Sequence, residues 1–449
     1  MPDALLSLSR HRWLRGAIRG LGLPTPMPLH RGEGAAGRAP LSGVRVLTHI
    51  DEQGIRAQRI RDALTGGGAS LQASTVEGTA QALLFDACEI VEATQSSALH
   101  RFFNAQLARL PANARIVLIA RDPSVCETPQ AAALARGCEG FMRSLAKEVG
   151  RRGSTANLIY LGDGAEDRLA GPLHYLLSAR SAFVTGQALR IDRLARAPHS
   201  AVAGSGLAGK LALVTGAAQG LGAAIAQRLA ADGARLLCVD VPANAQALQA
   251  LAGRCDAQPQ LLDVTDADAA GRIADRVRAM GGGVDIVVHN AGIIRDRTLA
   301  KMDPRHWAQC IAVNLEAILR IDAALLDGAL LRDEGRVICL SSIAGVAGNV
   351  GQTNYALTKA ALIGYVAAQA QRLAARGITV NAVAPGLIET PMMMTMPFLF
   401  REVARRMNSL SQAGVPADIA DAVGFLAAAD AHGVSGQTLR VCGQNLIGA

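Results

Sequence analysis

One helix-and-strand unit is repeated within this chain of 449 residues. QAAALARGCEGF at 130–141 runs in step with NYALTKAALIGY at 354–365, at an offset of 224 residues. Further along, FVTGQALR (183–190) matches GVSGQTLR (433–440) at an offset of 250, so the second copy is longer. We therefore expect two related halves, the first reduced. Chance similarity between two halves of one fold class is the alternative.

Short apolar runs of buried-strand type alternate with helical patterns in both halves. Such alternation predicts an α/β fold with two doubly wound parallel sheets, the second a full Rossmann-type unit. The predicted strands lie at 44–50, 82–87, 114–120 and 155–161, then at 211–216, 235–240, 260–264, 284–290, 335–341, 378–384 and 438–442.

Stretches rich in Gly, Pro and Arg separate the pieces. We predict a basic N-terminal segment and linker at 1–43, a reduced domain at 44–197, a linker at 198–209 and a full domain at 210–449. The stretch Arg10–Leu21 is basic and could be a transit peptide or a membrane-surface helix. Docking on its own protein or on a partner subunit is the interpretation we prefer.

Composition excludes several classes of protein. With 50% hydrophobic and 18% charged residues the chain is globular. Half of its net charge of +8 lies within the first 43 residues, which leaves too little for a nucleic-acid surface. The 8 cysteines and 9 histidines show no metal-ligand spacing, so we expect no metal and reduced thiols in a cytoplasmic protein. Three prolines interrupt the apolar stretch 379–400, so we expect no membrane span.

A glycine-rich turn, TGAAQGLG at 215–222, follows a predicted strand and begins a helical pattern. Glycines permit a tight turn and a close approach of the backbone to a pyrophosphate, which the helix N-terminus attracts. The turn therefore predicts a dinucleotide site. Its candidate cofactor-binding residues are Gly216, Gln219, Gly220, Leu221 and Gly222.

Asp240 closes the next predicted strand, where a carboxylate can accept bonds from an adenosine ribose. A 2′-phosphate there would bring about two negative charges within roughly 5 Å, which costs several kcal/mol at an effective dielectric of about 20. Gln219 also stands where an arginine could have neutralised that phosphate. We therefore predict NAD(H) over NADP(H). Asp263 and Val264 could meet the adenine, although an acid at a strand end is also an ordinary cap.

Tyr355 and Lys359 are four residues apart on a helical pattern, so both project from one face. A phenol beside an ammonium can protonate the oxyanion formed when a carbonyl accepts a hydride. Ser342 could hydrogen-bond the carbonyl oxygen, and Asn314 could order a water for proton relay to Lys359. Taken singly, each of these residues has an ordinary surface or capping role.

The combination resembles the short-chain dehydrogenase/reductase family over about 210–449. The resemblance rests on the glycine turn, on Asn290-Ala291-Gly292, on the Ser342/Tyr355/Lys359 spacing and on Pro385-Gly386. Within the family it is most similar to 3-oxoacyl-[acyl-carrier-protein] reductases. The extra N-terminal half resembles their high-molecular-weight version, whose first domain is flavodoxin-like.

The resemblance implies roles for particular residues. It makes Asn314, Ser342, Tyr355 and Lys359 the catalytic tetrad, and His289 departs from the more usual Asn with little expected consequence. The further cofactor-binding residues it implies are Asn290, Ala291, Gly292, Tyr355, Lys359, Pro385, Gly386, Ile388 and Thr390.

The insertion before the last strand contains MMMTMPFLF, whose flexible side chains suit an adaptable wall for an acyl chain. Ordinary core or an oligomer contact is the alternative. Basic residues after the Asn-Ala-Gly turn could attract phosphates of CoA or an acidic carrier protein. The candidate residues for contact with the acyl chain are Met392, Met393, Met394 and Phe398. The basic residues are Arg295, Arg297, Lys301 and Arg305.

We therefore predict NADH-dependent reduction of a 3-oxoacyl thioester, carried on CoA or acyl carrier protein, by a homodimer or homotetramer. Action on another secondary alcohol or ketone (a steroid, a sugar or a hydroxyacyl-CoA) is the first alternative, and a non-catalytic assembly subunit is the second. The first half has Ala131 and Ala135 where the second has Tyr355 and Lys359, and acids 51–52 where a phosphate would lie. We expect residues 44–197 to be catalytically silent and to supply an interface.

Overall fold

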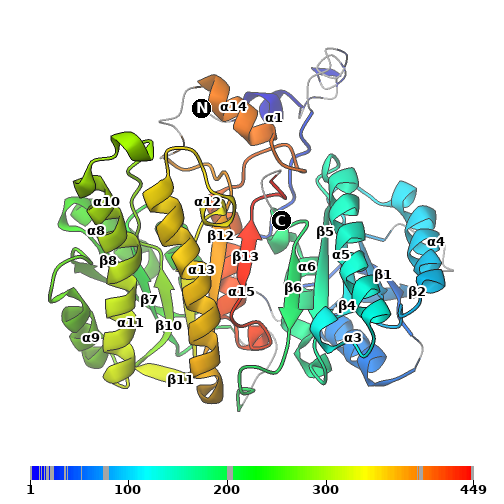
Figure 1. The fold of residues 1–449 in the computed structure, drawn as a ribbon, viewed down its shortest axis with the longest axis horizontal. Coiled ribbons are helices and arrows are strands. Elements are labelled where there is room, and N and C mark those ends of the chain that lie inside the picture. The colour runs from blue at the N-terminus through cyan, green and yellow to red at the C-terminus, as the bar shows by residue number, and fades with distance from the viewer. Residues whose placement is uncertain are drawn as a thin grey trace.

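The structure consists of two parallel sheets, each covered by helices on both faces (Figure 1). It is a computed structural model that describes residues 3–445 apart from positions 10, 12, 15, 17–19, 21–24, 35, 36, 38, 52, 74–79, 200–205, 392 and 394–397. Within this part of the chain, no helix has the length and hydropathy needed to cross a bilayer.

The first sheet has six strands in the order β2-β1-β3-β4-β5-β6, and its first five follow the flavodoxin-type order. Helices α3 and α6 contribute to one core and α4 and α5 to another, as expected for a doubly wound sheet. Its strands are β1 (Arg45–His49), β2 (Ser70–Ala73), β3 (Ala82–Asp86), β4 (Arg115–Arg121), β5 (Thr155–Leu161) and β6 (Ala188–Ile191). Its helices are α3 (Ile55–Gly66), α4 (Ser97–Gln106), α5 (Pro129–Gly150) and α6 (Ala170–Leu177).

The second sheet has seven strands in the order β13-β12-β11-β10-β7-β8-β9. The strand order reverses between β7 and β10, and ligands of such sheets bind outside the carboxyl ends of the strands at that point. Its strands are β7 (Leu211–Thr215), β8 (Arg235–Asp240), β9 (Gln258–Leu261), β10 (Val284–His289), β11 (Leu331–Leu340), β12 (Thr379–Pro385) and β13 (Thr438–Val441). Its helices are α7 (Gly220–Ala231), α8 (Ala245–Cys255), α9 (Ala269–Ala279), α10 (Pro304–Ile311), α11 (Ala317–Asp327), α12 (Ile343–Ala347), α13 (Thr353–Leu373), α14 (Phe398–Arg406) and α15 (Pro416–Ala427). The predicted α/β architecture with two parallel sheets is confirmed.

The repeated sequence also repeats its hydrogen bonds. In β5, Asn157 donates to the carbonyl of Val184 at 2.9 Å and accepts from the amide of Gln187 at 3.1 Å. Its counterpart in β12, Asn381, makes the corresponding two bonds at 2.8 and 3.1 Å. A buried asparagine therefore fixes the turn that leads into the last strand of each sheet.

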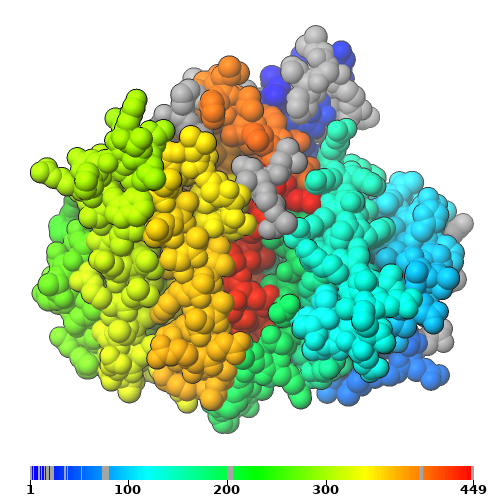
Figure 2. All heavy atoms as spheres, in the orientation of Figure 1, coloured from blue at the N-terminus to red at the C-terminus, as the bar shows by residue number. Residues whose placement is uncertain are grey.

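The last strands of the two sheets lie beside each other in opposite directions. The amide of Asp192, just beyond β6, donates to the carbonyl of Gly433 before β13. The amide of Gly443, just beyond β13, donates to the carbonyl of Phe183 before β6. Figure 2 shows the two halves closely packed along this seam. The carboxyl ends of the two sheets therefore lie on opposite sides of the molecule.

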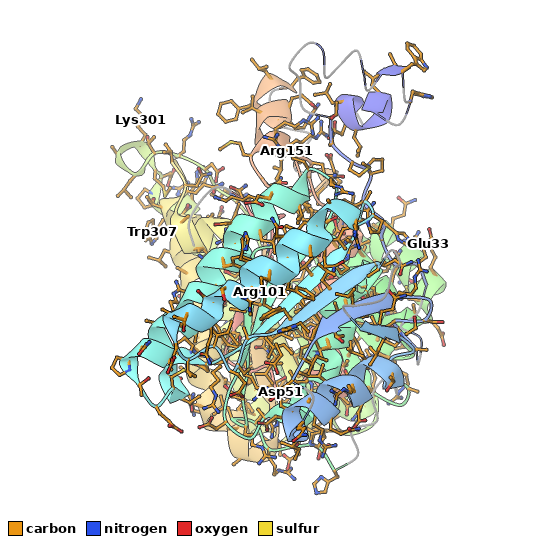
Figure 3. All side chains as sticks on the ribbon, turned by 90° about the vertical axis from the view of Figure 1, so that its right-hand side faces the viewer. Glu33, Asp51, Arg101, Arg151, Lys301 and Trp307 are labelled. Carbon is orange, nitrogen blue, oxygen red and sulfur yellow. The ribbon has the colours of Figure 1, made fainter. Side chains whose placement is uncertain are left out.

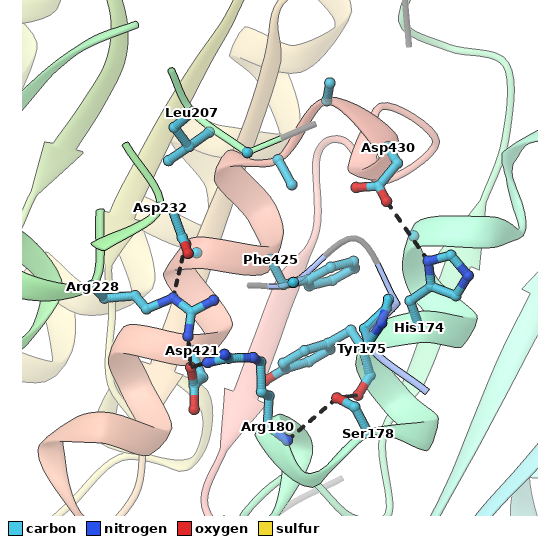
Figure 4. Close-up of a pocket in the computed structure, with 17 residues that line it drawn as sticks. His174, Tyr175, Ser178, Arg180, Leu207, Arg228, Asp232, Asp421, Phe425 and Asp430 are labelled. Atoms are coloured by element: carbon cyan, nitrogen blue, oxygen red, sulfur yellow. Dashed lines mark hydrogen bonds and ion pairs between the residues drawn. The ribbon is translucent and has the colours of Figure 1, made fainter. Parts of the chain in front are cut away.

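Helices α6 and α15 pack together across the seam. Tyr175 and Phe425, which are 250 residues apart, stack with their ring centroids 4.5 Å apart and an interplanar angle of 2°. Beside them Asp421 accepts from Arg180 of the first half at 2.8 Å and from Arg228 of α7 at 2.7 Å (Figure 4). Since α7 follows the glycine turn, the first half is connected to the helix that this turn begins.

The segment predicted as a linker makes specific contacts with both halves. Asn113 of the first half donates to the carbonyl of Pro28 at 3.1 Å, and Gln412 of the second donates to that of Met27 at 2.7 Å. Arg31 forms a two-point ion pair with Asp418 at 2.8 and 3.0 Å. Residues 27–31 thus dock on both halves, whereas most of the stretch Arg10–Leu21 lies outside the described residues and its docking stays a prediction. Near the start of the chain a short helix, α1 (Ala4–Ser9), lies against α14.

We expect Arg31→Ala to lower the free energy of unfolding by roughly 1.5–3 kcal/mol, the contribution of hydrogen bonds to a charged group. The reason is that Asp418, with 3% of its side chain exposed, would keep its charge and lose its cation. Thermal unfolding measures the change. Arg193→Ala is the control, because its 3.4 Å pair with Asp167 is largely exposed and should contribute little. Equal melting temperatures for both variants would contradict the prediction.

Candidate active site

The glycine turn leaves open space at the start of α7. Gly216 has a φ of 64°, and a Cβ there would lie 2.8 Å from the Cα of Ala291. A Cβ on Gly222 would lie 2.0 Å from the carbonyl oxygen of Gly216, so this position also requires glycine. Around Gly220, with a φ of 58°, nothing lies within 4 Å of such a Cβ. The turn is therefore shaped to admit a pyrophosphate beside the helix N-terminus, where Gln219 is the exposed N-cap residue and Leu221 lies in the first turn of the helix.

Asp240 is buried at the end of β8 and already bonded to the protein. Its carboxylate accepts from the amides of Ala218 and Val241 and from the side chain of Asn244, each at 2.8 Å. A carboxylate has about four acceptor positions, so one remains for a further donor. The bond to Ala218 also fixes the glycine turn, a role that the sequence did not reveal.

Asn290 supports the glycine turn from the end of β10. Its side-chain nitrogen donates to the carbonyls of Thr215 at 3.1 Å and Gly216 at 2.8 Å. The predicted cofactor residue is therefore also part of the structural frame of the turn. Asp263 accepts from the amide and hydroxyl of Thr265 at 2.9 and 2.7 Å, which is the capping role considered as the alternative. The neighbouring Val264 is buried.

Tyr355 and Lys359 lie together on the first turns of α13. The ammonium of Lys359 is 5.6 Å from the centroid of the Tyr355 ring and donates to the carbonyl of Leu340 at 2.7 Å. Ser342, the N-cap of α12, lies close enough to the Tyr355 phenol to lower its pKa, and it accepts from the amide of Ala344 at 3.1 Å. The structure thus brings together three of the four predicted catalytic side chains.

Asn314, the fourth, lies behind them in a π-helical turn, Ala312–Glu316. It is fully buried; its oxygen accepts from the amide of Ile293 at 2.8 Å and its nitrogen donates to the carbonyl of Ile293 at 3.0 Å. A Cβ on Gly292 would lie 3.3 Å from this oxygen and 3.4 Å from the Lys359 nitrogen. Asn314 therefore fixes the segment that passes over Lys359, and its ordering of a water for proton relay stays a prediction. Insertions of π-helix are frequent at functional sites.

Comparison with known proteins agrees with this arrangement. The family model described as enoyl-(acyl carrier protein) reductase matches residues 216–443. The 3-oxoacyl-[acyl-carrier-protein] reductase FabG of Escherichia coli (strain K12) is 41% identical over 236 residues, which cover 52% of this chain and 96% of that protein. The chain belongs to the short-chain dehydrogenase/reductase family.

Solved structures match the same extent of chain. A short-chain dehydrogenase/reductase from Serratia marcescens is 28% identical with a TM-score of 0.50, covering 53% of this chain and 98% of that one. A 3-oxoacyl (acyl-carrier-protein) reductase from Agrobacterium tumefaciens C58 with NADP bound is 32% identical with a TM-score of 0.50, covering 54% and 95%. The dehydrogenase/reductase half is therefore an NAD(P)-dependent oxidoreductase, while the family model leaves residues 1–215 unmatched.

Burial dominates the electrostatics of the dehydrogenase/reductase site. It lowers the pKa of Lys359 to about 8, although the thiols of Cys339 and Cys310 act in the opposite direction. Burial also raises the pKa of the Tyr355 phenol above its ordinary value, and the nearby Ser342 only partly offsets this. Tyr355 is therefore protonated at neutral pH, as a proton donor must be.

We expect the rate of carbonyl reduction to fall as the pH rises through about 8, the pKa of Lys359. Below that pH the ammonium is charged; above it the charge is lost and the rate should decrease about tenfold per pH unit. Initial rates of NADH oxidation between pH 6 and 10 measure the profile, with folding at each pH checked by circular dichroism. A flat profile to pH 10 would exclude a role for the Lys359 charge.

The predicted nicotinamide and substrate segments lie beyond β12. Pro385 ends that strand; a Cβ on Gly386 would lie 2.6 Å from the Cβ of Cys442, and Ile388 is buried. Thr390 accepts through its carbonyl from the amide of Met393, which is also buried. Phe398, in contrast, is 57% exposed on α14. Met392 and Met394 lie outside the described residues.

The basic residues after the Asn-Ala-Gly turn project from the dehydrogenase/reductase half. Arg297, Lys301 and Arg305 are exposed, and Lys301 reaches into solvent in Figure 3. Arg295 is partly covered and donates to the side chain of Gln309 at 3.1 Å. The three exposed basic side chains are therefore available to an anionic group in solution.

The corresponding region of the first half is filled by side chains. At the end of β1, the ring of His49 stacks on Phe85 with centroids 4.5 Å apart. Ala131 and Ala135 are buried in α5. Asp51 lies in the lower half of the view in Figure 3, whereas Lys301 lies near the top. No counterpart of the tyrosine–lysine pair or of the glycine turn faces this end of the first sheet among the residues described.

Two buried polar residues and one partly buried tyrosine behind the dehydrogenase/reductase site are not predicted by the sequence as functional residues. His289, Asp322 and Tyr365 form one hydrogen-bonded group, with the Asp322 carboxylate at its centre. Only the histidine was noticed, as a departure from Asn with little expected consequence. The sequence signal for this group is Asp322, an acid within the apolar pattern of α11, which can bond both a histidine and a tyrosine.

Proposed function

We propose that the protein reduces a 3-oxoacyl thioester to the 3-hydroxyacyl thioester with NADH. The observation that carries the proposal is the Lys359 ammonium, buried 5.6 Å from the Tyr355 ring beside an open glycine turn. A phenol and an ammonium held in this way form a proton donor for a carbonyl that is being reduced.

Each side chain has a defined task in this proposal. Bound NADH supplies the hydride, and the turn from Gly216 to Gly222 holds its pyrophosphate. Tyr355 donates the proton to the carbonyl oxygen. Ser342 directs its hydroxyl at the same oxygen and stabilises the charge that develops there. Lys359 adds a positive charge close to the phenol, which favours release of the proton.

The substrate class is inferred from the relatives and from the surface of this chain. Several of the relatives are named 3-oxoacyl-[acyl-carrier-protein] reductases. In this chain three exposed basic residues, Arg297, Lys301 and Arg305, follow the Asn-Ala-Gly turn. Such a cluster suits the phosphates of CoA or an acidic carrier protein. Met393 and Phe398 remain our candidates for contact with the acyl chain.

Acetoacetyl-CoA and NADH test the proposal. If the nicotinamide absorbance of NADH falls only when acetoacetyl-CoA is also present, the result supports thioester reduction. Turnover of other ketones, with none of acyl thioesters, supports a different substrate on the same chemistry. Failure to bind any nicotinamide cofactor would favour an assembly subunit.

We also propose a division of labour within the chain. Residues 210–449 carry the chemistry, and residues 44–197 supply a built-in interface along β6 and β13. This is supported by the stacked pair Tyr175 and Phe425, whose spacing of 250 equals the offset of the repeat. The first half then occupies a surface that a second catalytic domain could have used, and further association into dimers or tetramers remains part of the proposal.

A further inference from the structure

A buried carboxylate connects one element that carries residues of the site, α13, with two that adjoin such residues, β10 and α11. Asp322 on α11 lies with one oxygen 2.7 Å from Nε2 of His289, and its other oxygen accepts from the hydroxyl of Tyr365 at 2.5 Å. His289 is 1% exposed and Asp322 is 3% exposed. Because the carboxylate only accepts, Nε2 of the imidazole carries the proton. Burial and the carboxylate raise the pKa of Tyr365, so its hydroxyl remains a donor.

We propose that Asp322 is a bridge that fixes the catalytic helix α13 against the Asn-Ala-Gly turn, and that His289, Asp322 and Tyr365 are positioning residues for the reaction. The proposal rests on the proposed function, because Tyr355 and Lys359 are the groups that it positions.

Each end of the bridge continues directly into the site. Tyr365 lies on α13, the helix that carries Tyr355 and Lys359. His289 ends β10 and precedes Asn290, which supports the glycine turn. Asp322 lies on α11, which follows the π-helical turn that holds Asn314.

The gap that the bridge controls is narrow. A Cβ on Gly292 would lie 3.4 Å from the nitrogen of Lys359, so α13 and the turn after β10 are almost in contact there. Apolar packing tolerates small shifts between elements, whereas two hydrogen bonds to one carboxylate fix direction as well as distance. A misplacement of about 1 Å in a site of this kind can reduce the rate about 100-fold.

A buried tyrosine in the first half provides a matched control. Tyr160 on β5 donates to the carboxylate of Glu139 at 2.8 Å, and both are buried far from the site. Tyr160→Phe and Tyr365→Phe each remove one hydroxyl and one bond to a buried carboxylate. A purely structural role for Tyr365 would make the two variants behave alike.

The two variants are compared in melting temperature, kcat, KM for NADH and amide hydrogen exchange of residues 290–293. We expect similar losses of melting temperature. We expect only Tyr365→Phe to lower kcat, by about 10–100-fold, with KM for NADH changed less than about twofold, and only this variant to exchange faster at 290–293. Equal kcat and equal exchange in the two variants would overturn the proposal.

A double variant tests whether the two arms act through the same carboxylate. In the double variant His289→Asn/Tyr365→Phe, the loss of kcat should be smaller than the product of the losses in the two single variants. The reason is that either change alone already releases α13. Fully multiplicative losses would contradict a shared bridge. Should Tyr365→Phe not fold, His289→Asn carries the same comparison with Tyr160→Phe. The hydrogen-exchange measurement needs no substrate. It therefore tests whether Asp322 bridges the two elements even if acetoacetyl-CoA is not reduced.

Discussion

Replacing Tyr355 with Phe should reduce kcat for the NADH-dependent reduction of acetoacetyl-CoA by about 10³-fold, within the range that a positioned general acid contributes. The substitution removes one hydroxyl and keeps the ring over which the Lys359 ammonium lies at 5.6 Å. Packing of α13 should therefore be unchanged. The measurement is the initial rate of absorbance loss at the nicotinamide band, with NADH and thioester both saturating.

Two further measurements show that the loss is chemical. NADH should bind Tyr355→Phe with a Kd within about threefold of the wild-type value, because the hydroxyl contributes little to the binding of the nucleotide. Titration should give one NADH per chain, since only the second half has the glycine turn. Ser342→Ala should lose about 10²-fold, as expected for one donor to a developing oxyanion. A Tyr355→Phe enzyme with undiminished kcat would exclude the proposed proton donor.

Short-range patterns made most of the second half predictable. The strand that ends at Thr215, the turn at Gly216 and the helix that follows obey local rules, so their place in the sheet could be read from the sequence. The pair Tyr355 and Lys359 was predictable for the same reason, because helical spacing alone places both on one face. In the first half, β2 and β6 were not predicted as strands.

Contacts between distant segments were not predictable. Nothing near Asp240 indicates that it accepts from the amide of Ala218, and nothing near His289 indicates a carboxylate 33 residues further along the chain. The segment around Arg31 has the composition of a linker, yet it pairs with Asp418 across 387 residues. These contacts depend on how the sheets are placed, and local pattern contains no information on that placement.

We expect the wild-type enzyme to prefer NADH over NADPH by at least about 100-fold in kcat/KM. This ratio corresponds to about 2.7 kcal/mol. Asp240 is 7% exposed, so water screens its charge poorly. The Agrobacterium relative was solved with NADP bound, so the fold itself accepts a 2′-phosphate. The preference must therefore come from particular side chains, and the Asp240 carboxylate is the acid at the end of β8.

Asp240→Asn removes the charge and keeps an oxygen that can accept from the amide of Ala218, whose present distance is 2.8 Å. We expect this variant to gain about 10-fold or more in kcat/KM for NADPH, because the repulsion of several kcal/mol is relieved. Use of NADH should fall only a few-fold. Steady-state rates with both cofactors, at low and high salt, measure the discrimination.

Asp263→Asn is the matched control, because Asp263 is the acid after the next strand and its Oδ1 is bonded to Thr265. Removing its charge should leave the ratio of NADH to NADPH use unchanged within about twofold, since charges further from the phosphate are screened by salt. If the wild-type protein used NADPH as well as NADH, the carboxylate of Asp240 could not face the ribose. If Asp240→Asn left the ratio unchanged, the preference would have to come from the exposed Gln219 at the start of α7.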